Sequence, residues 1–148
     1  MAGAKTYDLK SIQMIVGGVS VDGAQDGDKA VMAFAEDAFT MTNGADGETQ
    51  FAKSNNASGT ITFTLLYSSG INQIFSDLYE ADRTNNGGLT SITLRDTRGA
   101  TLITARACRI QKFPDVTLAR EGGTMEWIFM CAELRANAGG LADEQPTV

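Results

Sequence analysis

Acidic side chains are the first candidates for chemistry in this sequence, which contains 18 Asp and Glu residues and no histidine. Asp22, Asp26 and Asp28 stand near glycines in "DGAQDGD", a segment that superficially resembles a calcium-binding loop. The alternating ligand spacing and the distal glutamate of such a loop are missing, so we expect no metal there. Glu36 and Asp37 are adjacent. Adjacent residues of a strand point to opposite faces, so we expect no catalytic carboxylate pair at these positions.

The absence of histidine excludes several classes of enzyme. A Ser-His-Asp triad, a Cys-His pair and a His-ligated zinc all require it. Cys108 and Cys131 are too few for a structural metal site or a disulfide framework, and each stands in an apolar run typical of small buried side chains. We therefore expect a protein that is not an enzyme and binds no cofactor. A hydrolase that uses carboxylates alone stays open as an alternative, and it would need two acids converging in a cleft.

Length and composition predict one globular domain. The chain has 148 residues, of which 43% are hydrophobic and 20% charged. No apolar run approaches a membrane span, and "MAGAKTYDLKS" lacks the apolar segment of a secretory signal, so we expect no membrane anchor. The formal net charge of −6 argues against wrapping nucleic acid, because that requires Lys and Arg to neutralise phosphates. A negative net charge is compatible with a surface along which nucleic acid passes without binding.

The spacing of apolar residues predicts the secondary structure, and it changes within the segment "GTITFTLLYSSGINQIFSDLYEADRT". Ile61, Phe63 and Leu65 alternate with threonines, which predicts a strand with one buried face. Apolar residues then recur at helical spacing, which predicts an amphipathic helix over about residues 70–82. This stripe comprises Ile71, Ile74, Phe75, Leu78 and Tyr79. We expect this helix to be the only one in the chain.

The remaining apolar runs predict short antiparallel strands. "LTSITLR" and "ATLITARACRI" flank a turn and predict a hairpin. "VTLA" and "TMEWIFMCAEL" also flank a turn and predict a second hairpin of two strands. Both faces of the last run are apolar: Met125, Trp127, Phe129 and Cys131 on one face, and Ile128, Met130, Ala132 and Leu134 on the other. That strand is therefore either central between layers or covered by another chain.

These elements predict a mainly β fold, an antiparallel β-sandwich or small barrel flanked by one α-helix, over residues 11–134. The residues that we assign to its core or to an interface are Ile61, Phe63, Leu65, Phe75, Leu78, Trp127 and Phe129.

Three features are suited to assembly: the long polar loop over residues 43–59, the C-terminal arm over 135–148 and the closing strand with two apolar faces. Residues 1–10 are expected to form an N-terminal arm. Structureless loops of this length are uncommon in compact domains and are usually functional or disordered. Phe51, the one large apolar side chain of the loop, either docks elsewhere or folds back on its own domain. The candidates for contacts with other copies are Tyr7, Asn43, Asp46, Glu48, Phe51, Lys53, Asn55, Asn56 and Leu141.

The order of these motifs resembles that of the tail tube proteins of contractile-tailed (myovirus-type) bacteriophages. A G-x-I-T-F-T-L strand that begins at Gly59 precedes the helix, and a D-x-x-G hairpin turn begins at Asp96. The segment "IQKFPD" at 110–115 and a closing strand with Trp127 follow. The resemblance covers about residues 10–134, and its specificity lies in the joint order of the motifs.

The resemblance implies a structural subunit that forms hexameric rings, which stack into a hollow tube for DNA ejection. The loop at 43–59 and the terminal arms would reach into the adjacent subunit or ring. The implied partners are copies of the chain itself and the tail sheath, baseplate, tape-measure and tail terminator proteins, with DNA passing through the lumen without specific binding. The implied location is the virion, after assembly in the host cytoplasm. The acidic side of the helix, with Asp77, Glu80 and Asp82, would face the sheath or the lumen; without a partner it is a solvated face.

Two alternatives stay open. The first is a tube protein of a phage-derived bacteriocin or of a type VI secretion system. The second, from another class, is a monomeric β-sandwich module that binds sugar or peptide. Such modules usually display aromatic platforms, whereas aromatic residues make up 7% of this chain and most occupy core-like positions.

Overall fold

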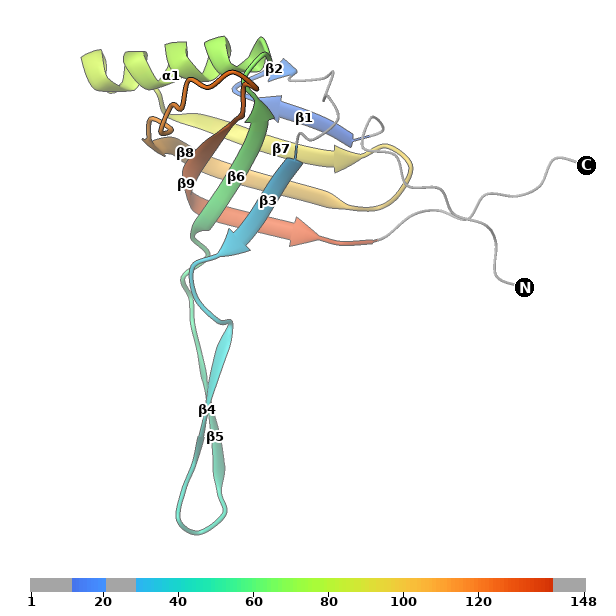
Figure 1. Ribbon diagram of the computed structural model, residues 1–148. Helices are drawn as coiled ribbons and strands as arrows, with labels where there is room; N and C mark the ends of the chain where they lie inside the picture. The colour runs from blue at the N-terminus through green and yellow to red at the C-terminus, as the bar shows by residue number, and fades with distance from the viewer. Residues whose placement is uncertain (1–11, 21–28, 140–148) are drawn as a thin grey trace, which may run out of the picture.

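The computed structural model describes residues 12–20 and 29–139, which form nine strands and one helix (Figure 1). Tyr7, Leu141 and the three aspartates of "DGAQDGD" lie outside these residues. The elements are β1 (Ile12–Val16), β2 (Val19–Ser20), β3 (Lys29–Phe34), β4 (Phe39–Asn43), β5 (Thr49–Lys53), β6 (Gly59–Leu66), α1 (Ile71–Asn85), β7 (Thr90–Asp96), β8 (Leu102–Lys112) and β9 (Thr124–Asn137).

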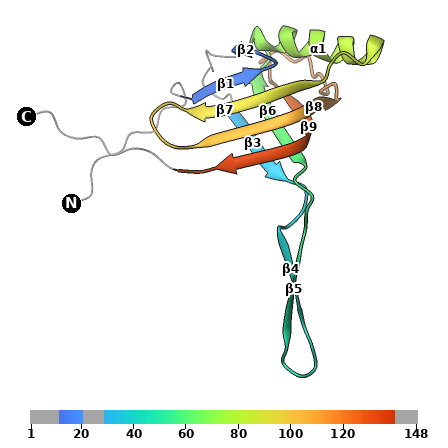
Figure 2. The ribbon, with the colours of Figure 1, turned by 180° about the vertical axis from the view of Figure 1, so that it is seen from behind.

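Seven strands form one antiparallel sheet in the order β2-β1-β7-β8-β9-β6-β3, and β4 and β5 form a separate pair. The long strand β9 pairs with β6 over 124–131 and with β8 over 128–137. The sheet therefore bends along β9, and β3 and β6 cross over β1, β7 and β8 as a second layer (Figures 1 and 2). The mainly β, sandwich-like fold with one helix is as predicted. β9 continues to Asn137, past the domain boundary expected at residue 134.

The core lies between the two layers and is rich in aromatic side chains. Ile61, Phe63 and Leu65 alternate along β6 and are buried, as are Trp127 and Phe129 of β9. The helix contributes Phe75, whose ring centroid lies 5.2 Å from that of Phe129 and 5.6 Å from that of Trp127. Leu78 is half-buried and packs at the margin of this core.

Helix α1 lies across one end of the sandwich (Figure 1) and extends beyond the expected residue 82. It ends at Asn85, and the next residue, Asn86, takes a left-handed conformation with φ 59°. The Asn86 N–H donates to the Asp82 carbonyl oxygen at 3.0 Å, and the Gly87 N–H donates to the Ala81 carbonyl oxygen at 3.2 Å. Asn is one of the few residues that accept this conformation readily, so the helix stops there.

The prediction of a strand at "VTLA", residues 116–119, is wrong. Val116 and Leu118 alternate with polar residues, but both are exposed, and no strand of the described chain pairs with this segment. Alternation alone does not make a strand when no neighbouring strand supplies hydrogen bonds. The segment is instead an irregular connection from β8 to β9, anchored where Phe113 packs against Tyr79 and Trp127 at centroid distances of 5.5 and 5.1 Å.

Candidate assembly surfaces

The segment predicted as a long irregular loop contains a strand. β4 and β5 pair antiparallel, with Phe39 opposite Lys53, Met41 opposite Phe51 and Asn43 opposite Thr49. This hairpin projects from the sandwich as a separate arm (Figures 1 and 2), and every residue of its two strands is exposed. The polar composition of residues 43–59 therefore reflects a solvated hairpin and its base rather than an absence of secondary structure.

The turn "NGADGET" closes the hairpin through local hydrogen bonds. The Gly44 N–H donates to the Glu48 carbonyl oxygen at 2.7 Å, and the Gly47 N–H donates to the Gly44 carbonyl oxygen at 3.1 Å. Gly47 has φ 82°, a conformation that favours glycine. The Thr49 hydroxyl donates to Asn43 Oδ1 at 3.0 Å. Asp46 and Glu48 are thereby presented at the tip of the arm.

The base of the hairpin is tied to the sandwich by Glu36 and Ser54. The Ser54 N–H donates to the Ala38 carbonyl oxygen at 2.8 Å, and the Ser54 hydroxyl donates to Glu36 Oε2 at 2.8 Å. Hydrogen bonds from Ser54 and Asn56 lower the pKa of the Glu36 carboxyl below its usual value. Glu36 and Asp37 occupy a bend between β3 and β4, so the prediction that they lie on a strand is wrong. Glu36 is thus a hydrogen-bond acceptor that positions the arm.

The candidate residues after β5 divide into two kinds. Asn56 has a local structural role, because its Oδ1 accepts the Ser58 N–H at 3.1 Å and its own N–H donates to Ser54 Oγ at 3.3 Å. Asn55 is exposed beside it. Both asparagines lie at the base of the arm, whereas Asp46 and Glu48 lie at its far end.

One face of the hairpin is apolar and faces solvent. Phe39, Met41 and Phe51 have exposed fractions of 57, 60 and 65%, and register places them on the same face, with Lys53 beside Phe39. A two-stranded hairpin is marginally stable by itself in water. This apolar face, defined here as Phe39, Met41 and Phe51, is therefore a candidate for contact with another surface. Phe51 was predicted as a contact residue, whereas Phe39 and Met41 were not, and pairing of β4 with β5 brings them beside it.

The free edge and outer face of the sheet form a second candidate surface. β3 ends the order of the described strands, so one of its sides has no strand beside it. Val31, Phe34 and Met130 are about half exposed on β3 and β9. Ile128, Met130 and Ala132 lie on the outer side of β9 as expected, but Leu134 is buried. The alternation of β9 slips between Cys131 and Leu134, where the strand leaves β6 and pairs with β8 alone.

The acidic residues of α1 do not form one surface. Asp77 and Glu80 are exposed, and Gln73 Nε2 donates to Asp77 Oδ1 at 2.9 Å. Asp82 is half-buried, and Arg109 Nη1 of β8 lies 2.6 Å from its Oδ1. This ion pair joins the helix to the sheet, so Asp82 is engaged within the subunit rather than available to a partner.

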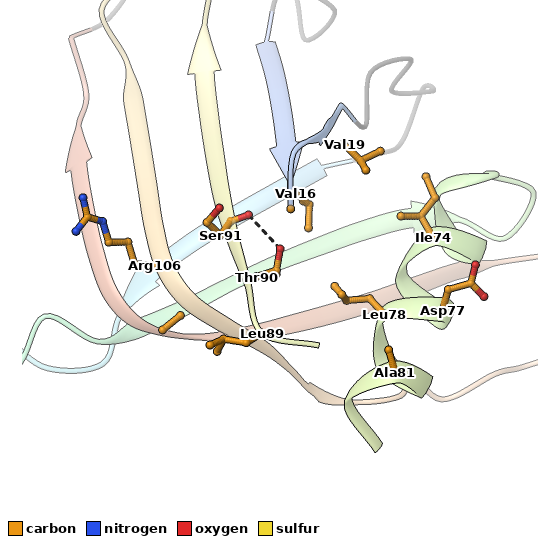
Figure 3. Close-up of a pocket in the computed structure, with 12 residues that line it drawn as sticks. Val16, Val19, Ile74, Asp77, Leu78, Ala81, Leu89, Thr90, Ser91 and Arg106 are labelled. Carbon is orange, nitrogen blue, oxygen red and sulfur yellow. Dashed lines mark hydrogen bonds between the residues drawn. The ribbon is translucent and has the colours of Figure 1, made fainter. Parts of the chain in front are cut away.

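A groove of about 770 Å³ lies between α1 and the strands β1 and β7 (Figure 3). Its apolar lining residues are Val16, Val19, Ile74, Leu78, Ala81 and Leu89. Val19, Ile74 and Leu89 are exposed along it, and Asp77 and Arg106 stand at its opposite ends in Figure 3. Ile74 belongs to the predicted helix stripe, but it faces this groove instead of the core.

The two cysteines are buried, unbridged register partners on β8 and β9. The hydrogen bond with Cys131, together with burial, raises the pKa of the Cys108 thiol far above its usual value, and the same hydrogen bond lowers the pKa of Cys131. Across residues 12–20 and 29–139, no cluster of Cys, Asp and Glu has the arrangement of a metal site. No helix within these ranges has the length and apolar character needed to cross a membrane.

Comparison with known proteins shows both a family and a fold. Residues 6–139 match the family model described as bacteriophage PhiTE tail tube protein. Comparison with curated protein sequences gives no match. Among solved structures, a chain of the anti-feeding prophage cap (AFP tube terminating cap) superposes with a TM-score of 0.63 at 11% identity, with 93% of this chain and 94% of that chain covered.

Two further structures come from an extracellular contractile injection system, PVC, in the extended state. A chain of its sheath/tube terminator has a TM-score of 0.62 at 11% identity, covering 91% of this chain and 99% of that one. A chain of its sheath-tube complex has a TM-score of 0.60 at 11% identity, with coverages of 89% and 91%. At this identity the likeness concerns the fold, and it extends over nearly the whole of each chain.

Proposed function

Because this chain belongs to the bacteriophage PhiTE tail tube protein family, we propose that it is the structural subunit of the inner tube of a contractile phage tail. In this proposal the subunits form hexameric rings that stack into a hollow conduit for DNA ejection. The proposed role of the subunit is structural: it forms part of the tube wall and carries out no catalysis. The observation that carries the proposal is the projecting hairpin, whose apolar face is not covered by any residue of 12–20 or 29–139.

Lateral contacts within a ring are supported by the sheet. β3 and β2 end the order of the strands that the structure describes, and an unpaired strand edge readily accepts another chain. In a closed ring each subunit would present one edge to each neighbour, a heterologous contact that closes by rotation. The half-exposed Val31, Phe34 and Met130 would be covered at such contacts.

Passage of DNA is compatible with the charge of the subunit. The chain carries 12 Lys and Arg residues against 18 Asp and Glu residues, a net charge of −6. Binding to phosphate backbones relies on released counterions and on basic side chains, so an acidic wall would release DNA rather than hold it. Asp77 and Glu80 of the exposed helix face are candidates for contacts with the sheath or the lumen.

The proposal places the protein in a phage tail, assembled in the host cytoplasm and present in the virion. Its partners would be further copies of the chain, the tail sheath, and the baseplate, tape-measure and tail terminator proteins. The terminal arms, with Tyr7 and Leu141, are proposed to take part in contacts between subunits together with Asn43 and Asn55.

A tube of a phage-derived bacteriocin or of a type VI secretion system is the second candidate. It is favoured by the structural likeness to chains of the anti-feeding prophage cap and of the PVC injection system. The subunit would form the same kind of tube, and only the particle that contains the tube would differ. The gene neighbourhood discriminates between them: capsid and terminase genes beside this one favour a phage tail.

Electron microscopy of the purified protein, combined with sedimentation velocity, tests the proposed function. We expect rings and hollow rods, with large particles whose amount rises with protein concentration. A single particle of about 15.7 kDa at every concentration, without rings or rods, would contradict it and favour a monomeric binding module.

A further inference from the structure

The apolar hairpin and the groove beside α1 lie at opposite ends of the subunit. Figures 1 and 2 show the arm of β4 and β5 extending from one end of the sandwich, while α1 crosses the other end. The hairpin therefore cannot reach the groove of its own chain. Any contact between these two surfaces must join two copies. In a head-to-tail arrangement it is a heterologous contact, which propagates along an axis where the rotation does not close.

The two surfaces match in size and polarity. The hairpin exposes two phenylalanines and a methionine on one face. The groove offers about 770 Å³ lined mainly by aliphatic side chains, and Val19, Ile74 and Leu89 are half-exposed along it. Pockets that enclose most of a small organic ligand are roughly 300–1,000 Å³, so a groove of this volume has room for several side chains. Burial of aromatic side chains would supply most of the contact energy.

The charges at the ends of both surfaces also match. On the hairpin, Lys53 lies beside Phe39 at the base, and Asp46 and Glu48 lie at the tip. On the groove, Asp77 of α1 stands at one end and Arg106 of β8 at the other (Figure 3). A hairpin whose base lies at the helix would bring Lys53 to Asp77 and direct the acidic tip toward Arg106. The reverse orientation would bring like charges together.

We propose that the groove lined by α1, β1 and β7 is the acceptor for the hairpin of a second copy of this chain, with Phe39, Met41 and Phe51 inside it. Lys53 pairs with Asp77 and sets the orientation. The inference rests on the proposed function, since it names which surface of the next subunit receives the arm when subunits stack. It also explains why the apolar Ile74 is left facing solvent in a single subunit.

Cysteine cross-linking tests the contact in the full chain. The double variant Phe51→Cys/Ile74→Cys, oxidised at high protein concentration, should give a ladder of covalent dimers, trimers and longer chains on a denaturing gel. The matched control Phe51→Cys/Leu118→Cys places the second thiol on an exposed apolar residue outside the groove and should give no ladder. The single variant Phe51→Cys reports any background from the buried Cys108 and Cys131.

Charge reversal tests the orientation. Lys53→Glu and Asp77→Lys should each raise the protein concentration needed for assembly about fivefold, and the double variant should return it close to the original value. Tubes that form without a Phe51–Ile74 ladder would overturn the inference while leaving the proposed function intact. A ladder in a protein that forms no rings or rods would support the contact and overturn the proposed function. Neither ladder nor tubes would overturn both.

Discussion

Asn72 joins three parts of the molecule through one side-chain amide. Its Oδ1 accepts the Trp127 Nε1–H at 2.9 Å, and its Nδ2 donates to the carbonyl oxygens of Leu66 and Tyr67 at 3.0 and 3.2 Å. We expect Asn72→Ala to lower the free energy of unfolding by about 1–3 kcal/mol, because the N–H of the buried Trp127 loses its acceptor. Urea unfolding followed by the fluorescence of Trp127, the single tryptophan, measures the change. Gln73→Ala, which removes an exposed hydrogen bond, is the control and should change stability little.

Trp127 itself has a core position with no exposed surface. It contacts the rings of Phe75 and Phe113, so its removal leaves a large cavity. Trp127→Ala should therefore destabilise the subunit by about 3–5 kcal/mol, measured by circular dichroism during urea unfolding. Normal stability with lost assembly would instead assign Trp127 to an interface.

Glu36 gives the base of the hairpin a dependence on pH. Hydrogen bonds from Ser54 and Asn56 depress the pKa of its carboxyl in the folded state. Their stabilising effect is thus fully present above the ordinary glutamate value of about 4.3, and it is lost as pH falls through the lower folded value. Ser54→Ala should move the pKa of Glu36 upward toward its ordinary value in an NMR titration. An unchanged titration curve would show that Ser54 does not hold this carboxylate.

At the scale of elements, the hairpin is expected to be dispensable for folding and essential for assembly. Its strands make no contribution to the buried core, and Ala38 and Ser54 already meet at its base through a 2.8 Å hydrogen bond. Joining these two residues by a short Asn-Gly turn should leave the unfolding free energy within about 1 kcal/mol of the original. The same variant should form no tubes in electron micrographs.

This replacement is more conservative than removing residues 43–59. The end of that segment belongs to the sandwich, because Leu134 donates its N–H to the Ala57 carbonyl oxygen at 2.7 Å and Gly59 begins β6. An unfolded product of the Asn-Gly replacement would show that the arm is part of the folding unit. An assembled product would show that contacts other than the hairpin build the tube.

Elements with one buried face were predictable from the sequence, whereas β5, which is exposed on both faces, was not. β6 and α1 each bury one stripe, so their periods of two and of about 3.6 are visible in the residue types. β5 is exposed throughout and therefore carries no burial period. Phe51 was identified because it is the one large apolar residue among polar ones, whereas Phe39 and Met41 become its neighbours only through the β4–β5 register. The bend of the sheet along β9 depends on pairing between distant segments, which no local pattern encodes.

At the scale of the whole molecule, the surfaces available for contacts with other copies lie on different sides of the subunit. The strand edges of the described sheet are suited to neighbours within a ring, and the hairpin and the groove beside α1 face opposite ends of the subunit (Figures 1 and 2). One set of contacts can therefore close by rotation while the other propagates. Under the proposed function, a subunit with this arrangement would grow into a tube rather than into a compact oligomer.

Thermal unfolding should accordingly depend on assembly. A contact that exists only between folded subunits stabilises the folded state by mass action, so the unfolding midpoint of the intact chain should rise with protein concentration. The variant with the Asn-Gly turn in place of the hairpin should keep the same midpoint at every concentration, because its head-to-tail contact is gone. Differential scanning fluorimetry over a hundredfold range of concentration compares the two. Equal, concentration-independent midpoints would mean that the subunit completes its structure alone, and a parallel rise in both would assign the stabilisation to the sheet edges instead of the arm.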